Sequence, residues 1–189
     1  MKLLVVDLDG TLFRGNTLNL WVRTAFNRLV RTGRVVSAAG VGFWVILRKL
    51  RMVSHRRMKF HLMRLTSPVG TPAVIDGFST AVARGFNSEV MALVETHISK
   101  GDKVVLATAA PDLYVGAVAH RAGISLWVAT PMSQRPDEYA ECRGEAKLRA
   151  VLSVTGPWSA YDEVTVVTDH ADDTPLLHAN TSGRNILIR

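Results

Sequence analysis

The sequence predicts an α/β fold in which a doubly wound parallel sheet carries an inserted helical subdomain. A short, continuously apolar run recurs along the chain, at residues 3–7, 103–107, 125–129, 164–167 and 185–188. Runs of this length are too short for an amphipathic helix and fit strands that are buried on both faces. Helical segments separate the later runs, whereas a much longer helical interval separates the first two.

The segments between the later strands carry helix signals. Residues 88–100 repeat apolar side chains at helical spacing, and a glycine follows them directly. The stretches 112–122 and 145–154 likewise end at or just before a glycine. A glycine in this position is typical of a helix C-terminus. Strand and helix therefore alternate, as the fold class requires.

The interval between the first two strands indicates further helices. Asn16 or Thr17 can cap the first of them. Its apolar face consists of Leu18, Trp21, Val22, Ala25 and Leu29. A second helical stretch runs from about Val35 to Leu65, and the sequence SPVGTP at 67–72 ends it.

Length and composition fit a globular protein with this insertion. The chain has 189 residues, of which 48% are hydrophobic, enough for a sizeable core. We expect residues 1–14 and 86–189 to form the α/β core and residues 15–85 to form the insertion. The single cysteine, Cys142, cannot form an internal disulfide, and Asp7 interrupts the apolar start before it reaches the length of a secretory signal. The sequence therefore predicts a cytoplasmic protein.

Charge is distributed unevenly along the chain. No Asp or Glu occurs between Asp9 and Asp76, although 12 of the 23 Lys and Arg residues lie in that interval. The rest of the chain has 16 acidic and 11 basic residues, so the net charge of +7 combines a basic insertion with an acidic core. This asymmetry predicts that the insertion meets an anionic partner or substrate.

Acidic side chains gather where strands end. Asp7 and Asp9 follow the first strand and Asp169 follows the fourth, at the edge where open parallel sheets bind ligands. Together with Asp172 and Asp173, these carboxylates would repel one another strongly if left uncompensated. A hard divalent cation resolves the conflict, and Mg²⁺ bound by one or two carboxylates plus a phosphate is the expected form.

Four segments, in order along the chain, resemble the motifs of haloacid-dehalogenase-like hydrolases. DLDGT at 7–11 resembles the first motif, and Thr108 after VVLA resembles the second. Lys147 in GEAK resembles the third, and VTDHADDTPLL at 167–177, with two Asp residues four positions apart, resembles the fourth. The resemblance implies a Rossmann-like sheet. It also implies that the insertion is a helical cap, of the kind found in phosphoserine-phosphatase-like members.

The resemblance further implies a Mg²⁺-dependent phosphatase. Asp7 would attack phosphorus to form an aspartyl-phosphate, and Asp9 would protonate the leaving alkoxide and later activate water. The second Asp favours phosphate transfer, since dehalogenases of this family lack it. The implied metal ligands are Asp7, Asp9 through its backbone carbonyl, Asp169 and Asp173. The implied phosphate-binding residues are Gly10, Thr11, Thr108, Ala109 and Lys147.

Each of these residues also has a simpler interpretation. Asp9 could belong to a turn, Asp169 could cap a helix, Thr108 could end a strand and Lys147 could be a surface lysine; only the ordered set favours catalysis. Asp172 stays open between helix capping and a metal role. His170 and Thr168 replace smaller residues that are usual there, which affects how freely the metal site is hydrated. The remaining histidines are expected to be surface or structural residues: His55, His61, His97, His120 and His178. Cys142 is expected to be inert.

Residues 35–47 are thirteen uncharged residues flanked by Arg34 and by Arg48-Lys49. As a helix they would span roughly 20 Å, too short for the ~30 Å core of a bilayer. Two interpretations stay open. The helix is buried in the core of the cap, or it forms an apolar surface that contacts lipid while basic residues meet anionic headgroups. The basic run at 48–64 is equally compatible with a solvated helix face.

The cap decides the expected substrate. Phosphoserine is disfavoured, because that branch commonly places a Glu after the first motif and residues 12–17 contain no acid. The pattern resembles phosphatidylglycerophosphatases and hydrolase domains fused to prenyltransferases, which implies a lipid-linked phosphate and peripheral membrane contact. The alternatives are a small metabolite phosphate and a catalytically weak phosphate-binding interaction protein. Nucleic acid is not expected, because the aromatic residues near the basic ones sit in apolar patterns.

Overall fold

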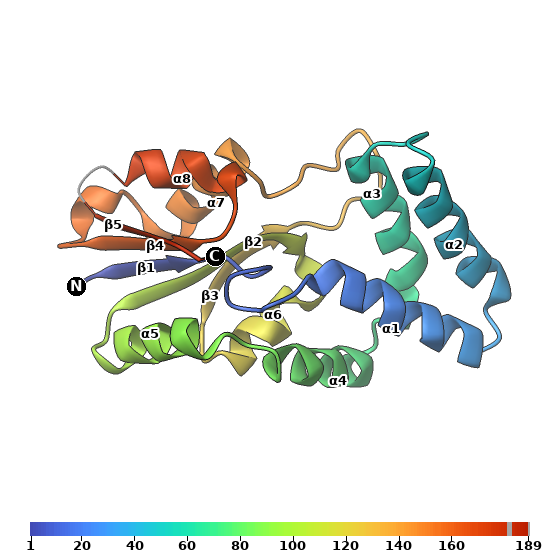
Figure 1. The fold of residues 1–189 in the computed structure, drawn as a ribbon, viewed down its shortest axis with the longest axis horizontal. Helices are drawn as coiled ribbons and strands as arrows, with labels where there is room; N and C mark the ends of the chain where they lie inside the picture. The colour runs from blue at the N-terminus through green and yellow to red at the C-terminus, as the bar shows by residue number, and fades with distance from the viewer. Residues whose placement is uncertain (181–182, 189) are drawn as a thin grey trace.

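The computed structural model describes residues 1–180 and 183–188, which contain a five-stranded parallel sheet (Figure 1). The strands are β1 (Leu3–Val6), β2 (Lys103–Pro111), β3 (Leu126–Thr130), β4 (Val164–Thr168) and β5 (Arg184–Leu187). Their order is β3-β2-β1-β4-β5, so the chain leaves the central strand in both directions. The predicted doubly wound α/β class is confirmed.

Helices cover both faces of this sheet (Figure 1). The helices α5 (Ser88–Ser99) and α6 (Asp112–Arg121) lie on one face, and α7 (Glu145–Thr155) and α8 (Thr174–Ala179) lie on the other. In β1, Leu4 and Val6 join one hydrophobic cluster while Leu3 and Val5 join the other. Because successive side chains of a strand point to opposite faces, a continuously apolar strand needs a layer on each side.

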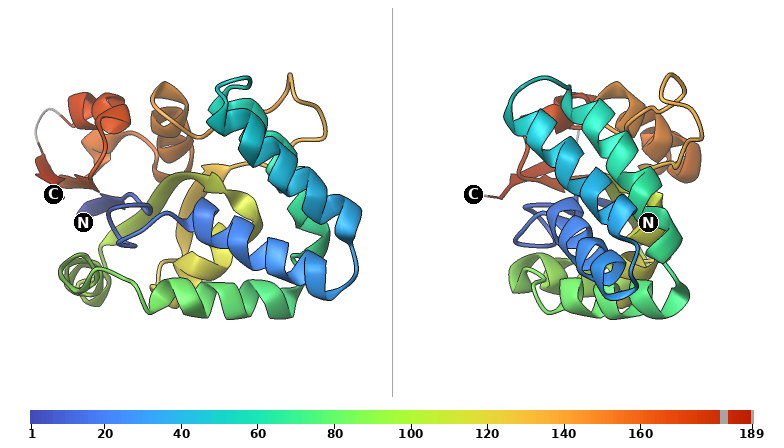
Figure 2. Two further views of the ribbon diagram at one scale, coloured as in Figure 1. Left: turned by 45° about the vertical axis from the view of Figure 1, so that its right-hand side comes forward. Right: turned by 90° about the vertical axis from the view of Figure 1, so that its right-hand side faces the viewer.

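A group of helices between β1 and β2 lies beside the carboxyl ends of the strands (Figures 1 and 2). These helices are α1 (Thr17–Arg31), α2 (Val35–Lys49), α3 (His55–Thr66) and α4 (Pro72–Ala83). Asn16 caps α1 as one of the two predicted residues, because its side chain accepts a hydrogen bond from the Asn19 N–H. The buried Trp21 ties the group together: its indole N–H donates to Thr66, and its ring packs edge-on against Phe78.

The expectation of one helical stretch from Val35 to Leu65 is wrong, because two helices occupy it. After α2 ends, Arg51 adopts a left-handed conformation with φ of 59°, and the side chain of Ser54 accepts a hydrogen bond from Arg57 N–H to begin α3. No Gly or Pro occurs between residues 43 and 67, so the usual signals of a helix end are missing. The predicted break at 67–72 is present as a 3₁₀ turn (Ser67–Val69), after which Pro72 begins α4.

The chain enters and leaves the insertion through two segments that lie side by side. Phe13 and Phe86 form an isolated antiparallel bridge. Arg14 N–H donates to the Gly85 carbonyl at 3.1 Å, and Asn87 N–H donates to the Leu12 carbonyl at 2.7 Å. This paired crossing coincides with the predicted boundaries at residues 14 and 86. It supports the division into core and cap, which stays a prediction.

Helix α2 packs with one side and exposes the other. Ala38 and Val41 of this helix are buried and Trp44 and Val45 pack against the core, while Val36 and Phe43 are 85% and 55% exposed. Of the two interpretations of residues 35–47, burial in a cap core therefore accounts for only part of the apolar composition. Among the described residues, no helix combines the length and hydropathy needed to cross a membrane.

Candidate active site

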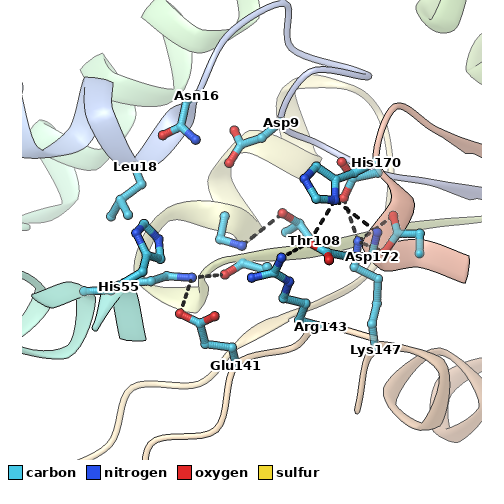
Figure 3. A pocket seen from close by; sticks show the side chains of 15 residues that line it. Asp9, Asn16, Leu18, His55, Thr108, Glu141, Arg143, Lys147, His170 and Asp172 are labelled. Carbon is cyan, nitrogen blue, oxygen red and sulfur yellow. Dashed lines mark hydrogen bonds and ion pairs between the residues drawn. The ribbon is translucent and has the colours of Figure 1, made fainter. Parts of the chain in front are cut away.

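Six of the predicted site residues line one cavity of about 200 Å³ at the carboxyl edge of the sheet (Figure 3). They are Asp7, Asp9, Thr108, Ala109, Lys147 and Asp173. Parallel strands bring their carboxyl ends to one edge, which explains why residues more than a hundred positions apart meet here. The other predicted residues, Gly10, Thr11 and Asp169, contact one another beside this cavity without lining it.

Lys147, near the start of α7, joins two carboxylates. Its Nζ lies 2.8 Å from Asp7 Oδ1 and 2.7 Å from Asp173 Oδ1, and only 4% of the lysine side chain is exposed. Asp173 also accepts a hydrogen bond from the Thr168 hydroxyl at 2.7 Å. Burial lowers the pKa of Lys147, but attraction to Asp7 and Asp173 outweighs it, so the pKa is raised. Lys147 is therefore a fixed cation beside Asp7.

The two aspartates of the first loop both have raised pKa values. Burial raises the pKa of Asp7 to about 7; Lys147 opposes this rise, whereas Asp173 and Asp9 add to it. Burial also raises the pKa of Asp9, although Thr17 N–H, at the start of α1, donates to Asp9 Oδ1 at 2.7 Å. In Figure 3 the Asp9 carboxyl points into the cavity, across from Arg143 and Lys147.

Gly10 allows the first loop to lie against Asp169. Its φ is 81°, in the left-handed region, and a Cβ at this position would fall 2.0 Å from Asp169 Oδ2. The Thr11 hydroxyl donates to Asp169 Oδ1 at 3.2 Å. Any side chain at position 10 would therefore displace Asp169 from the loop that carries Asp7 and Asp9.

Thr108 and Ala109 lie where β2 departs from regular pairing. The register between β2 and β3 shifts between Ala107 and Pro111. Thr108 is buried, and its Oγ1 accepts a hydrogen bond from Ala110 N–H at 3.0 Å. The Ala109 carbonyl accepts from Lys59 Nζ at 2.6 Å and from the Thr130 hydroxyl at 2.7 Å. The backbone next to Thr108 is thus fixed from both the core and α3.

Several lining residues were missed by sequence reasoning. Lys59 reaches the cavity from α3, and its Nζ lies 3.3 Å from Glu141 Oε1. Burial lowers the pKa of Lys59 against the opposing effect of Glu141. Arg143 forms an ion pair with Asp172, and His55, which is exposed as expected, also lines the cavity. His55 reaches this position because the Ser54 cap begins α3 there; the only sequence signal for these cap residues was the basic run at 48–64.

The residues of the fourth motif divide between two environments. Asp172 pairs with Arg143 and with His170, whose Nδ1 lies 2.8 Å from Asp172 Oδ2. Asp173 is buried against Lys147 and Thr168. Asp172 therefore lines the cavity in a partly exposed ion pair with Arg143, apart from the buried bridge that Lys147 makes to Asp173.

Comparison with known proteins places this arrangement in a family. The family model described as haloacid dehalogenase-like hydrolase matches residues 4–178. The chain belongs to this family. Its hydrolase motifs begin at the Asp7 loop and end beyond Asp173, so the match includes every residue of the cavity described above. No curated protein matches the chain.

Solved structures share the haloacid dehalogenase-like fold. A protein with unknown function from Bordetella pertussis Tohama I superposes with a TM-score of 0.75 at 24% identity, over 98% of this chain and 89% of that one. A phosphoserine phosphohydrolase-like protein from Francisella tularensis has a TM-score of 0.61 at 19% identity, over 99% and 87%. A phospho-aspartyl intermediate analogue of phosphoserine phosphatase gives 0.54 at 13% identity, over 98% and 85%.

The donor atoms of this hydrolase suit a hard divalent cation. Asp7 is a buried carboxylate whose pKa is raised despite Lys147, so it can accommodate further positive charge. Asp169 is held at the same loop through Thr11 and Gly10. Two carboxylates and a backbone carbonyl of Asp9 match the small protein ligand set that Mg²⁺ uses alongside a phosphate. The described residues contain no group of three or more His, Cys, Asp or Glu side chains arranged for a metal, and Asp173 is engaged by Lys147.

The raised pKa of Asp7 predicts a pH-dependent stability in EDTA. The unfolded chain releases this proton near pH 4 and the folded protein near pH 7. Stability attributable to Asp7 is therefore lost as pH rises from about 4 to about 7, by at most about 4 kcal/mol. The wild type should therefore lose thermal stability relative to Asp7→Asn as pH rises, and the melting temperature of the variant should gain roughly 5–10 °C on that of the wild type across this window. A difference in melting temperature that stays constant between pH 4.5 and pH 8 would contradict this prediction.

Proposed function

We propose that the protein is a Mg²⁺-dependent phosphatase that hydrolyses a phosphate monoester through an aspartyl-phosphate on Asp7. The observation that carries the proposal is the buried Lys147 bridge between Asp7 and Asp173, with the Asp9 carboxyl directed into the same cavity. A nucleophile beside a fixed cation and a carboxyl with a raised pKa are the two groups that this reaction needs. One structural neighbour is described as a phospho-aspartyl intermediate analogue, which agrees with this chemistry.

The proposed reaction has two displacement steps. In the first, an Asp7 carboxylate oxygen bonds to phosphorus, the ester P–O bond breaks, and Asp9 donates its proton to the leaving alkoxide. In the second, Asp9 takes a proton from water, the hydroxide bonds to phosphorus, and the Asp7–phosphorus bond breaks to release phosphate. The raised pKa of Asp9 favours the protonated form for the first step. The Thr17 N–H holds the carboxyl in place for both steps.

Positive charge at the phosphoryl group has two sources in this proposal. Asp7, Asp169 and the Asp9 carbonyl would hold Mg²⁺, which would supply Lewis-acid stabilisation of the phosphoryl oxygens when bound. Lys147 and the Thr108 hydroxyl supply donors that are already fixed before the substrate binds. Gly10, Thr11 and the Ala109 backbone complete the phosphate-binding loop as the family pattern implies.

The proposed substrate is an amphiphilic, lipid-linked phosphate whose headgroup enters the cavity. A cavity of about 200 Å³ holds a phosphoryl group and a small polar neighbour. Lys59 and Arg143, which pair with Glu141 and Asp172 in the same lining, are the cations that favour a further anionic group there. A hydrocarbon tail would stay outside, near the exposed α2. The same cavity lining favours the second candidate, a small anionic metabolite phosphate.

A panel of esters tests the function and separates the two substrate classes. With an aryl phosphate, we expect at least roughly 100-fold more hydrolysis in Mg²⁺ than in EDTA. The kcat/KM for a short-chain lipid phosphate should exceed that for its deacylated analogue by about tenfold, the effect of two buried methylenes. Equal kcat/KM values would assign a soluble metabolite. Hydrolysis of no ester in the panel, with phosphate binding retained, would instead indicate a phosphate-binding interaction protein.

A further inference from the structure

The outer side of α2 presents large apolar side chains to solvent, at its first turn and through its second half. We define the α2 apolar face as Val36, Phe43, Ile46 and Leu50, the last directly after the helix, which are 85%, 55%, 56% and 63% exposed. Their spacing of seven, three and four residues places them on one side of a helix. Single exposed apolar residues are common on proteins, but a contiguous row marks an interaction surface.

The inner side of α2 is already used for packing, so the outer face is not a misplaced core. Trp44 stacks on His61 of α3, with ring centroids 3.8 Å apart and planes at 6°. A Cβ at Gly40 would lie 3.1 Å from Leu65, which shows how closely α2 approaches α3. Ala38 and Val41 are the buried residues of the helix. Figures 1 and 2 show α2 at the outer end of the helical group, away from the sheet.

Unpaired basic residues border the α2 apolar face at both ends. Arg31 and Arg34 precede α2, Arg48 and Lys49 lie in its last turn, and Arg51 follows it. Within residues 1–180 and 183–188, no ion pair involves any of these five side chains. Residues 10–75 contain no Asp or Glu, so no acidic side chain of the same segment neutralises these five positive charges.

We propose that α2 is an interfacial helix that docks on the surface of a bilayer containing anionic lipid. An apolar row between basic ends lies flat on such a surface, with hydrocarbon contact from the row and headgroup contact from Lys and Arg. A second copy of the chain fits less well, because two faces of this kind would bring like charges together. His55 begins α3 five residues after Leu50 and lines the cavity, so the α2 apolar face ends five residues before the cavity lining begins.

Vesicle co-sedimentation of the full chain tests this docking. Wild-type protein should bind vesicles of phosphatidylcholine with 30% phosphatidylglycerol, and bind pure phosphatidylcholine at least tenfold more weakly. Raising NaCl from about 50 mM to about 500 mM should weaken binding by screening the Lys and Arg contacts. The double variant Phe43→Glu/Ile46→Glu should lose at least about tenfold in binding, because it sets charge against hydrocarbon.

Matched variants keep the result interpretable. Leu187→Glu places the same charge at a 62% exposed leucine of β5 and should bind like the wild type. Hydrolysis of a soluble aryl phosphate and circular dichroism check that Phe43→Glu/Ile46→Glu is folded. Docking does not rest on the proposed function, so Asp7→Asn should bind vesicles normally even without activity. The proposal is overturned if wild-type protein ignores anionic vesicles, if the double variant binds as well as Leu187→Glu, or if the face proves instead to mediate self-association.

Discussion

Replacement of Asp7 by Asn is expected to abolish phosphatase activity while leaving the protein folded. The amide keeps the size and shape of the side chain but cannot form the aspartyl-phosphate, so kcat should fall by about three orders of magnitude or more for every substrate. Since burial raises the pKa of Asp7 to about 7, replacing the carboxylate by a neutral amide should also remove the cost of burying its charge near neutral pH.

The loss must be separated from a structural effect. Lys147 retains Asp173 as its partner in the variant, at 2.7 Å in the wild type, so the bridge to the fourth motif remains. Thermal unfolding in EDTA and steady-state hydrolysis of an aryl phosphate are therefore measured on the same preparation. A variant that keeps more than about a tenth of the wild-type kcat would exclude Asp7 as the nucleophile.

The sequence predicts the centre of this site well because parallel strands place their carboxyl ends at one edge. Asp7 directly follows β1, and Thr108 lies in β2 just beyond its pairing with β1, which runs from Leu3 opposite Lys103 to Val6 opposite Leu106. Lys147 could be selected from the order of motifs, and the structure brings its Nζ to 2.8 Å from Asp7. Short-range patterns therefore suffice for residues that a regular sheet positions.

Residues contributed by the insertion could not be predicted in the same way. Lys59 is one of several cations in a basic helix, and only the packing of α3 against the core brings its Nζ to Ala109 and Glu141. The turn at Arg51 carries no Gly or Pro signal, yet it sets where α3 begins. The exposure of Phe43 depends equally on which side of α2 meets α3. These are tertiary effects that helical periodicity does not determine.

Replacement of Asp9 by Asn is expected to affect esters according to their leaving group. An alkoxide leaves poorly without a proton, so phosphoenzyme formation from an alkyl phosphate should slow by roughly 10²–10⁴-fold, the usual contribution of a general acid. An aryl oxide leaves readily, and the same step should slow by less than about tenfold. The Thr17 N–H that orients the Asp9 carboxyl at 2.7 Å can still donate to the amide oxygen of Asn.

Rapid-quench measurement of the phosphoenzyme distinguishes this role from a merely structural one. Asp9 also activates water in the second step, so Asp9→Asn should accumulate phosphoenzyme from the aryl ester, whereas Asp7→Asn should form none. If Asp9→Asn only displaced the first loop, hydrolysis of both esters would slow by the same factor, because that loop also carries Asp7. An equal loss for alkyl and aryl substrates would therefore remove Asp9 from the acid role. The raised pKa that burial gives this carboxyl would then serve no step of the reaction.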